Sequence, residues 1–254
     1  MYTYNDIKKV QERLLDMANV IKSILESHNI PYFITYGTLL GAIRHGGFIP
    51  WDDDFDFHLF EDSYDLAIET LRKYLPENMF LEDEKSEPLY FHGWAHVKDL
   101  RSSTKCDLFP QDNSYTHKGI SIDLYKIYKV KESFEKEFLI KEHIAYLNRR
   151  KEKELIDINL YNNRIEKLYQ ELNEHGNHHN CPEPDCDIYV CPGIYNDFFY
   201  LHELQPLKKY KFEDTYFYGP NCSEVFLTRC YGRYMSYPSR DNRHPHYSEV
   251  IFLD

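Results

Sequence analysis

The chain lacks a long apolar run. In its 254 residues no apolar stretch approaches the ~20 residues that a membrane-spanning helix needs. Its first nine residues contain no apolar core of the kind that a signal peptide carries. We therefore expect a cytoplasmic protein without a transmembrane segment, one that could still touch a membrane surface transiently.

Positive charge is also scarce. Lys and Arg number 30 against 42 Asp and Glu, which gives a formal net charge of −12. Because nucleic-acid binders hold phosphates mainly with Lys and Arg, this balance argues against a nucleic-acid partner. A small anionic substrate remains compatible, since a divalent cation held by carboxylates can bring phosphates to an acidic protein.

The six cysteines do not suggest a disulfide framework, because cytosolic thiols stay reduced. Half of them instead crowd together with two histidines, in the set His178, His179, Cys181, Cys186 and Cys191. Three thiols and an imidazole are enough for a tetrahedral structural Zn²⁺ site. The spacing is wider than the common C-x₂-C, so a polar loop with free thiols is the alternative.

Hydrophobic periodicity and turn residues divide the chain into three parts. We predict a catalytic core over residues 1–130, a helical insertion with the His/Cys cluster over 131–195, and a return to the catalytic domain over 196–254. The expected helices cover residues 6–28, 39–44 (capped by Thr38), 63–75, two within 132–174, and 222–235. The expected strands cover 32–36, 55–60 and 119–127.

Two carboxylates follow the strand pattern at residues 55–60. Side chains alternate between the faces of a strand, so Asp54 and Asp56 point one way while Phe55 and Phe57 point into the core. Like charges placed so close repel, and Mg²⁺, a hard cation that prefers oxygen ligands, relieves the repulsion. A solvated acidic turn after Pro50 is the alternative.

A third carboxylate lies in the strand predicted at 119–127. Ile120, Ile122 and Leu124 share one face of that strand, so Asp123 lies on the other. If the two strands are neighbours, Asp123 completes a three-carboxylate metal site. Sites of this kind position a phosphate and activate an attacking oxygen.

Gly37 and Thr38 stand between a predicted strand and a predicted helix. Backbone N–H groups and a hydroxyl at a helix N-terminus can bind a phosphate. Gly37 and Thr38 alone would be a weak signal, but their position ahead of Asp54 and Asp56 supports a phosphate-binding role.

These features form one block, YGTLLGAIRHGGFIPWDDDFD, at residues 36–56. The block closely resembles the LicD family, which includes bacterial phosphocholine transferases and has the fukutin-type ribitol-phosphate transferases as distant relatives. Residues 97–104, 120–124, 204–213 and 231–235, followed by Pro238, Arg243 and His246, resemble further parts of the family pattern.

The resemblance implies an α/β (α+β) nucleotidyltransferase fold, a mixed sheet flanked by helices, that uses Mg²⁺ or Mn²⁺. It also implies a phosphotransferase with a CDP-alcohol donor. The phospho-alcohol, phosphocholine or similar, would pass to a sugar hydroxyl of a glycan or glycolipid in lipopolysaccharide, teichoic acid or capsule. The helical insertion is specific to this chain and is a candidate for acceptor choice.

The resemblance also assigns roles to single residues. Asp54, Asp56 and Asp123 match the metal-binding carboxylates, and Asp52 matches an acidic position that joins or orients them. The substrate-contacting positions are Gly37, Thr38, Arg44, Lys98 and Arg101. At position 233 the chain departs from the family, because Arg stands where relatives often carry Asp.

Two questions stay open at this point. The proton of an acceptor hydroxyl could go to Asp52 or to His58. The same fold could also move a nucleoside monophosphate from an NTP, or the chain could be a non-catalytic binding module built around zinc.

Overall fold

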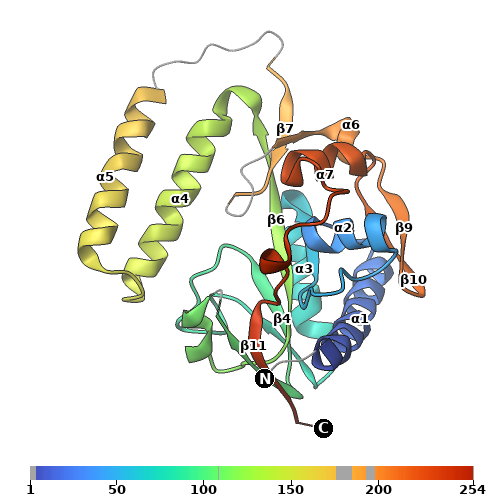
Figure 1. Ribbon diagram of the computed structural model, residues 1–254. Helices are drawn as coiled ribbons and strands as arrows, with labels where there is room; N and C mark the ends of the chain where they lie inside the picture. The colour runs from blue at the N-terminus through green and yellow to red at the C-terminus, as the bar shows by residue number, and fades with distance from the viewer. Residues whose placement is uncertain (1–3, 108, 176–184, 193–197, 254) are drawn as a thin grey trace.

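The computed structural model describes residues 4–107, 109–175, 185–192 and 198–253. At its centre lies a curled mixed sheet (Figure 1). The strand order is β1 (Tyr32–Ile34), β2 (Asp56–Phe60), β6 (Ser121–Lys131), β4 (Ala95–Asp99) and β3 (Met79–Glu82). Only β2 and β6 run parallel among these neighbours. The structure confirms the mixed sheet flanked by helices.

The far half of β6 extends the sheet in another direction. It pairs with β7 (Asp187–Val190), which pairs with β8 (Phe198–Tyr200). Two smaller antiparallel pairs complete the β-structure. They join β9 (Lys208–Phe212) to β10 (Thr215–Gly219), and β5 (Ser102–Cys106) to β11 (Tyr247–Phe252).

The helices cover the sheet from two sides. One face packs on α1 (Tyr4–Ser27) and α3 (Glu61–Tyr74), which also touch each other. It buries Phe55, Phe57 and Leu59 completely, as strand alternation predicts. The other side carries α2 (Tyr36–His45), which contacts β2, and α7 (Ser223–Tyr231), which packs on α2. The short helix α6 (Leu201–Leu204) joins α7 to β7 and β8. The rest of that face forms the floor of a cleft.

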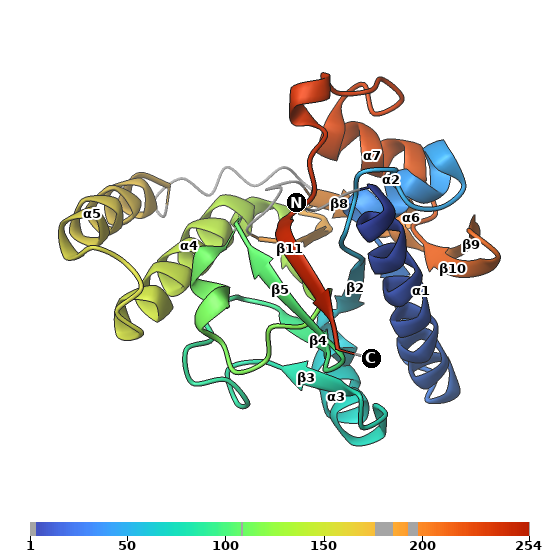
Figure 2. The same cartoon turned by 60° about the horizontal axis from the view of Figure 1, so that its bottom comes forward.

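Two long antiparallel helices, α4 (Glu135–Glu152) and α5 (Ile158–His175), stand to one side of the sheet (Figures 1 and 2). They form a small core of their own, consisting of Ile140, Ile144, Leu147, Tyr161 and Leu168. This confirms the two helices predicted within 132–174. The division of the chain into three parts remains a prediction.

Short 3₁₀ turns complete the chain at η1 (Pro110–Ser114), η2 (Glu132–Phe134) and η3 (Arg240–Asn242).

The N-cap predicted at Thr38 was wrong, because α2 begins at Tyr36 and its N-cap is Thr35. Tyr36 has a φ of 43°, in the left-handed region, so the chain turns from β1 directly into α2. Within the described ranges, no helix has the length and apolarity to cross a membrane.

Candidate active site

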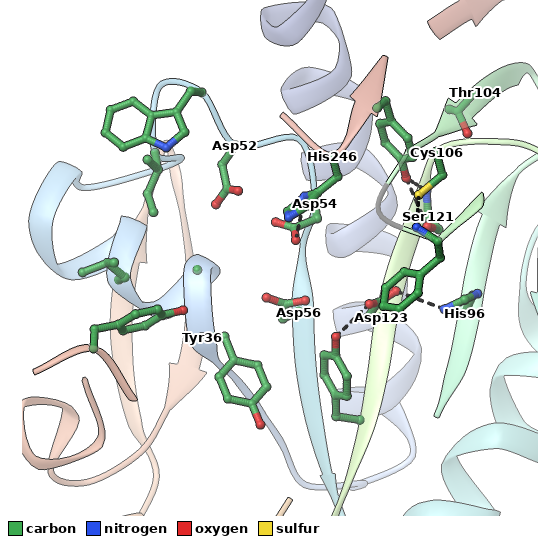
Figure 3. Close-up of a pocket in the computed structure, with 18 of the residues that line it drawn as sticks. Tyr36, Asp52, Asp54, Asp56, His96, Thr104, Cys106, Ser121, Asp123 and His246 are labelled. Atoms are coloured by element: carbon green, nitrogen blue, oxygen red, sulfur yellow. Dashed lines mark hydrogen bonds and ion pairs between the residues drawn. The ribbon is translucent and has the colours of Figure 1, made fainter. Parts of the chain in front are cut away.

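A cleft of about 820 Å³ opens on the sheet face opposite α1 and α3 (Figure 3). Its floor is formed by β2, β6 and β4 and its walls by the start of α2, the loop before β2, and the segment that leads into β11. The sequence-predicted carboxylates Asp52, Asp54, Asp56 and Asp123 all line this cleft.

The parallel pairing of β2 and β6 brings the predicted acidic residues together. Asp56 and Asp123 are register partners, and the Asp123 N–H donates to the Phe55 carbonyl over 3.0 Å. Side chains at paired positions lie on the same face, so both carboxylates point into the cleft. The Asp56 carboxylate makes no hydrogen bond to any residue that the structure describes.

Burial and mutual repulsion define the electrostatics of this cluster. Burial raises the pKa of Asp56 well above the ordinary value, and the charges of Asp54, Asp123 and Asp52 raise it further. The pKa of Asp52 is raised for the same reasons, burial first and Asp54 second. Buried like charges with few hydrogen-bond donors are costly unless a cation joins them.

The residues present fit a hard divalent cation. Ligand atoms of Asp52, Asp54 and His246 all lie within 4.8 Å of one another. The Asp54 Oδ1 atom is buried and has no hydrogen-bond partner among the described residues. A set dominated by carboxylate oxygens suits Mg²⁺ or Mn²⁺ better than soft ions.

His246 is a residue of this site that sequence reasoning did not place there. Its Nδ1 lies 3.2 Å from Asp54 Oδ2 and 3.2 Å from Asp53 Oδ1. The charge of Asp54 raises the pKa of His246 to about 11 against the effect of burial. His246 belongs to the C-terminal family pattern, but no local spacing links it to residues almost 200 positions earlier.

Asp53 points away from the cleft, as alternation predicts, and has a structural task. It is fully buried and accepts the backbone N–H groups of His246 at 2.7 Å and Tyr247 at 3.1 Å. Asp53 therefore fixes the C-terminal segment that carries His246 over the cleft.

Of the two residues predicted to contact a phosphate, Gly37 lines the cleft and Thr38 does not. Thr38 is buried and its Oγ1 accepts the Asp56 N–H over 2.9 Å, so the hydroxyl supports the start of β2. Gly37 lines the cleft, and a Cβ there would lie 2.9 Å from Asp52 Oδ2. A side chain at this position would therefore displace the Asp52 carboxylate.

Of the three predicted cationic residues, Arg44 and Lys98 line the cleft and Arg101 does not. Arg44 lines the cleft, but its Nη1 donates to the carbonyls of Tyr234 at 2.8 Å and Ser236 at 3.3 Å. Lys98 also lines the cleft, whereas Arg101 lies beyond the end of β4, outside it, and pairs with Asp99 at 3.4 Å. The structure therefore does not bring Arg101 to the other candidates.

His58 was the wrong choice as a proton acceptor. It shares the Asp56 face of β2, but it is fully buried against the rings of Tyr36 and Tyr125. Burial lowers its pKa to about 3. An acceptor in the cleft cannot reach this ring.

A row of polar residues continues from Asp123 across the sheet. His96 on β4 is the register partner of Asp123 and also of Glu82 on β3. Its Nε2 lies 3.4 Å from Asp123 Oδ1, and its Nδ1 lies 3.2 Å from Glu82 Oε2. Tyr125 also donates its hydroxyl to Asp123 over 2.9 Å. The two neighbours fix the orientation of the third carboxylate.

The predicted zinc ligands fall mostly outside the described residues, where His178, His179 and Cys181 lie. Cys186 and Cys191 flank the extended strand β7, so their Cα atoms are about 16 Å apart. Cys191 is buried, and burial raises the pKa of its thiol to about 12. One tetrahedral ion cannot bind both cysteines, so the five residues do not form a single site.

Comparison with known proteins connects the site to a family. Residues 29–162, more than half of the chain, match the family model described as LicD/FKTN/FKRP, nucleotidyltransferase domain. This range includes β1, α2, the acidic run, β4, Asp123 and α4, so the helical segment expected to be specific to this chain lies partly inside the family match. The His246 segment lies outside it.

Individual relatives match over shorter ranges or at lower identity. The lipopolysaccharide cholinephosphotransferase LicD of Haemophilus influenzae is 31% identical over 97 residues, which is 38% of this chain and 37% of that protein. The ribitol 5-phosphate transferase FKRP of Homo sapiens is 40% identical over 47 residues, 18% of this chain and 10% of that protein. An uncharacterized protein of Rickettsia typhi is 25% identical over 246 residues, 96% of this chain and 53% of that protein. The chain thus spans about half, or less, of the length of these relatives.

Proposed function

Because the chain belongs to the LicD/FKTN/FKRP nucleotidyltransferase-domain family, we propose that it is a metal-dependent phosphotransferase. It moves a phosphorylated alcohol from a CDP-activated donor to a sugar hydroxyl of a glycan or glycolipid. Two relatives support this class of reaction by their names, a cholinephosphotransferase and a ribitol 5-phosphate transferase. We also propose a cytoplasmic location, in keeping with the free thiols of the described cysteines.

The observation that carries the proposal is the convergence of Asp54, Asp56 and Asp123 in one cleft. These carboxylates would hold Mg²⁺ or Mn²⁺, with Asp52 and His246 beside them. The bound ion supplies positive charge for the diphosphate of the donor.

The side chains of the cleft have separate tasks in this proposal. Gly37 leaves space beside Asp52, while Tyr125 and His96 hold Asp123 in its orientation. A carboxylate of the cluster takes the proton of the acceptor hydroxyl. Asp52, which lies beside the three carboxylates assigned to the cation, is the candidate for this step.

Product analysis tests the proposal and separates it from nucleotidyl transfer. Purified protein with Mg²⁺ is incubated with CDP-choline, CDP-ribitol, CDP-glycerol or CTP. Release of CMP from one of the CDP-alcohols is the expected result. Release of pyrophosphate from CTP, with no CMP from any CDP-alcohol, would replace phospho-alcohol transfer by nucleotidyl transfer. Absence of both products and of Mg²⁺-dependent thermal stabilisation by every nucleotide would favour a binding module.

A further inference from the structure

A second cavity of about 290 Å³ lies beside the cleft, between β6 and α4. The side chains of Trp94, Phe109 and Tyr125 line both cavities, so they form a shared wall. Tyr125 links the two chemically as well, because its ring lines the second cavity while its hydroxyl donates to Asp123. The second cavity therefore adjoins the acidic cleft on the side of the helical pair.

Helix α4 gives one of its faces to this cavity. The lining residues on the helix follow i, i+3, i+4, i+7 and i+10 spacing, which places them on one side: Leu139, Glu142, His143, Tyr146 and Arg149. Ile140, Ile144 and Leu147 belong to the core shared with α5. Helix α4 thus packs on α5 with one face and presents a mixed aromatic and polar face to the cavity.

The polar groups of the cavity include one half-buried carboxylate, that of Glu142. Burial raises the pKa of Glu142, whose carboxylate makes no hydrogen bond or ion pair with any residue in the described part of the chain. Arg149 is held in place, since its Nε donates to the Phe91 carbonyl over 3.2 Å. Its Nη2 lies 3.2 Å from where a side chain at Gly93 would begin, so this glycine leaves room for the guanidinium.

The cavity suits a neutral sugar better than a cation. Its aromatic walls would also suit a quaternary ammonium, but Lys126 and Arg149 outweigh the single carboxylate of Glu142. About 290 Å³ lies at the lower end of small-molecule pockets and gives room for one sugar ring. Rings such as Tyr146 can cover the C–H faces of a sugar while Glu142 accepts from its hydroxyls.

Four Lys and Arg side chains line the main cleft, namely Arg44, Lys98, Lys118 and Arg233. Arg44 is joined by a further arginine, since the guanidinium groups of Arg44 and Arg243 lie over the same Tyr237 ring and Arg243 also lies 5.1 Å from the Trp51 ring centroid. We assign the anionic donor to this arginine end of the cleft, away from α4. In phosphoryl transfer the attacking and leaving oxygens lie on opposite sides of the phosphorus, roughly in line. An acceptor that meets a donor held at the arginine end must therefore arrive from the α4 end.

We propose that the cavity between β6 and α4 binds a neutral sugar unit of the acceptor. This inference rests on the proposed phosphotransferase function. It assigns acceptor recognition to α4, so the helical pair sets which glycan is modified, while the acidic cleft binds the donor.

Ligand-observed NMR tests the assignment with methyl glucoside, methyl galactoside and methyl N-acetylglucosaminide as probes. We expect at least one probe to bind the full chain, and Glu142→Gln to weaken that binding about tenfold through loss of a charged hydrogen-bond acceptor. Glu152→Gln is the matched control, because it makes the same change at an exposed position of α4 outside the cavity, and it should bind as the unaltered chain does.

Three outcomes would overturn the assignment. They are no binding of any probe, undiminished binding to Glu142→Gln, and displacement of the probe by choline chloride, which would make the cavity a site for the transferred alcohol. CMP release from the CDP-alcohols, measured in parallel without acceptor, reports on the proposed function alone. It should be the same in Glu152→Gln as in the unaltered chain.

Discussion

Two groups of carboxylates in this chain differ in what surrounds them. Asp99 is fully buried and accepts from Arg13 Nη1 over 2.8 Å, and Glu203 accepts from Arg229 Nη2 over 2.8 Å. Asp53 accepts two backbone N–H groups. The cleft carboxylates Asp52, Asp54, Asp56 and Asp123 instead lie close enough to repel one another, although Tyr125 and His96 contact Asp123 and His246 contacts Asp54.

The difference separates carboxylates that hold the fold from carboxylates that await a ligand. In the first group each charge has a fixed partner, so removing it leaves the partner buried and uncompensated. In the second group the charges repel, so neutralising one relieves the fold and removes a metal ligand. The same change of Asp to Asn should therefore have opposite effects on stability in the two groups.

The largest effect is expected from Asp56→Asn. This variant should lose about a thousandfold in the rate of CMP release, because it replaces a charged carboxylate ligand by a neutral amide and so loses several kcal/mol of transition-state stabilisation. Its melting temperature without metal should equal or exceed that of the unaltered chain. A folded variant with normal turnover would remove Asp56 from the mechanism.

Asp99→Asn should show the reverse pattern. Loss of the buried ion pair with Arg13, whose side chain is only 13% exposed, should lower the free energy of unfolding by about 3 kcal/mol in a denaturant titration. Turnover per folded molecule should stay unchanged, since neither residue lines the cleft. If Asp99→Asn destabilises the chain no more than Asp→Asn at an exposed position does, the distinction between the two groups of carboxylates is wrong.

Glu82 links the two groups of carboxylates, because it is fully buried like Asp99 and contacts the cleft residue Asp123 through His96. It is fully buried with a pKa raised to about 7 by burial, and it reaches Asp123 through His96. Removing such a supporting group from a metal ligand commonly costs 10–100-fold in metal affinity. Glu82→Leu should weaken Mn²⁺ binding by about this factor, measured by electron paramagnetic resonance.

The conservative variant provides the control for this prediction. Glu82→Gln keeps an amide that can hydrogen-bond to His96 and should retain most of the Mn²⁺ affinity. Equal loss in both variants would show that Glu82 acts through the charge itself or through packing.

The smallest expected effect concerns pH. The raised pKa values of Asp52 and Asp56 mean that the folded, metal-free chain keeps protons that the unfolded chain loses above about pH 4. This contribution to stability is present at low pH and is lost as pH rises through the raised pKa values. The gain in melting temperature on adding Mg²⁺ should therefore be about 2–4 °C larger at pH 8 than at pH 5. A gain that is independent of pH would contradict these shifts.

Local patterns were enough to predict the acidic centre. Alternation along β2 and β6 placed Asp54, Asp56 and Asp123 on one face, and their neighbours Phe55 and Ile122 in the core. Such predictions succeed because the facing of a strand residue depends on its near neighbours alone. Helices α4 and α5 were predictable because helical spacing of apolar residues is also a local pattern.

The remaining features depend on contacts between distant parts of the chain. His58 lies on the same strand face as Asp56, yet α2 and α7 cover it. Thr38 and Arg44 carry the residue types of phosphate ligands, but their side chains bind backbone groups of Asp56 and Tyr234. His246 reaches the site only because Asp53 binds the C-terminal backbone. Residue spacing along the sequence cannot predict these contacts.

The most direct test of the central claim is the binding of Mn²⁺ to Asp56→Asn and to Asp99→Asn, measured by calorimetry beside the unaltered chain. If the mutually repelling carboxylates of the cleft hold the cation, Asp56→Asn should lose measurable binding while Asp99→Asn, at temperatures where it is folded, retains it. Equal Mn²⁺ binding by the unaltered chain and Asp56→Asn would contradict the account.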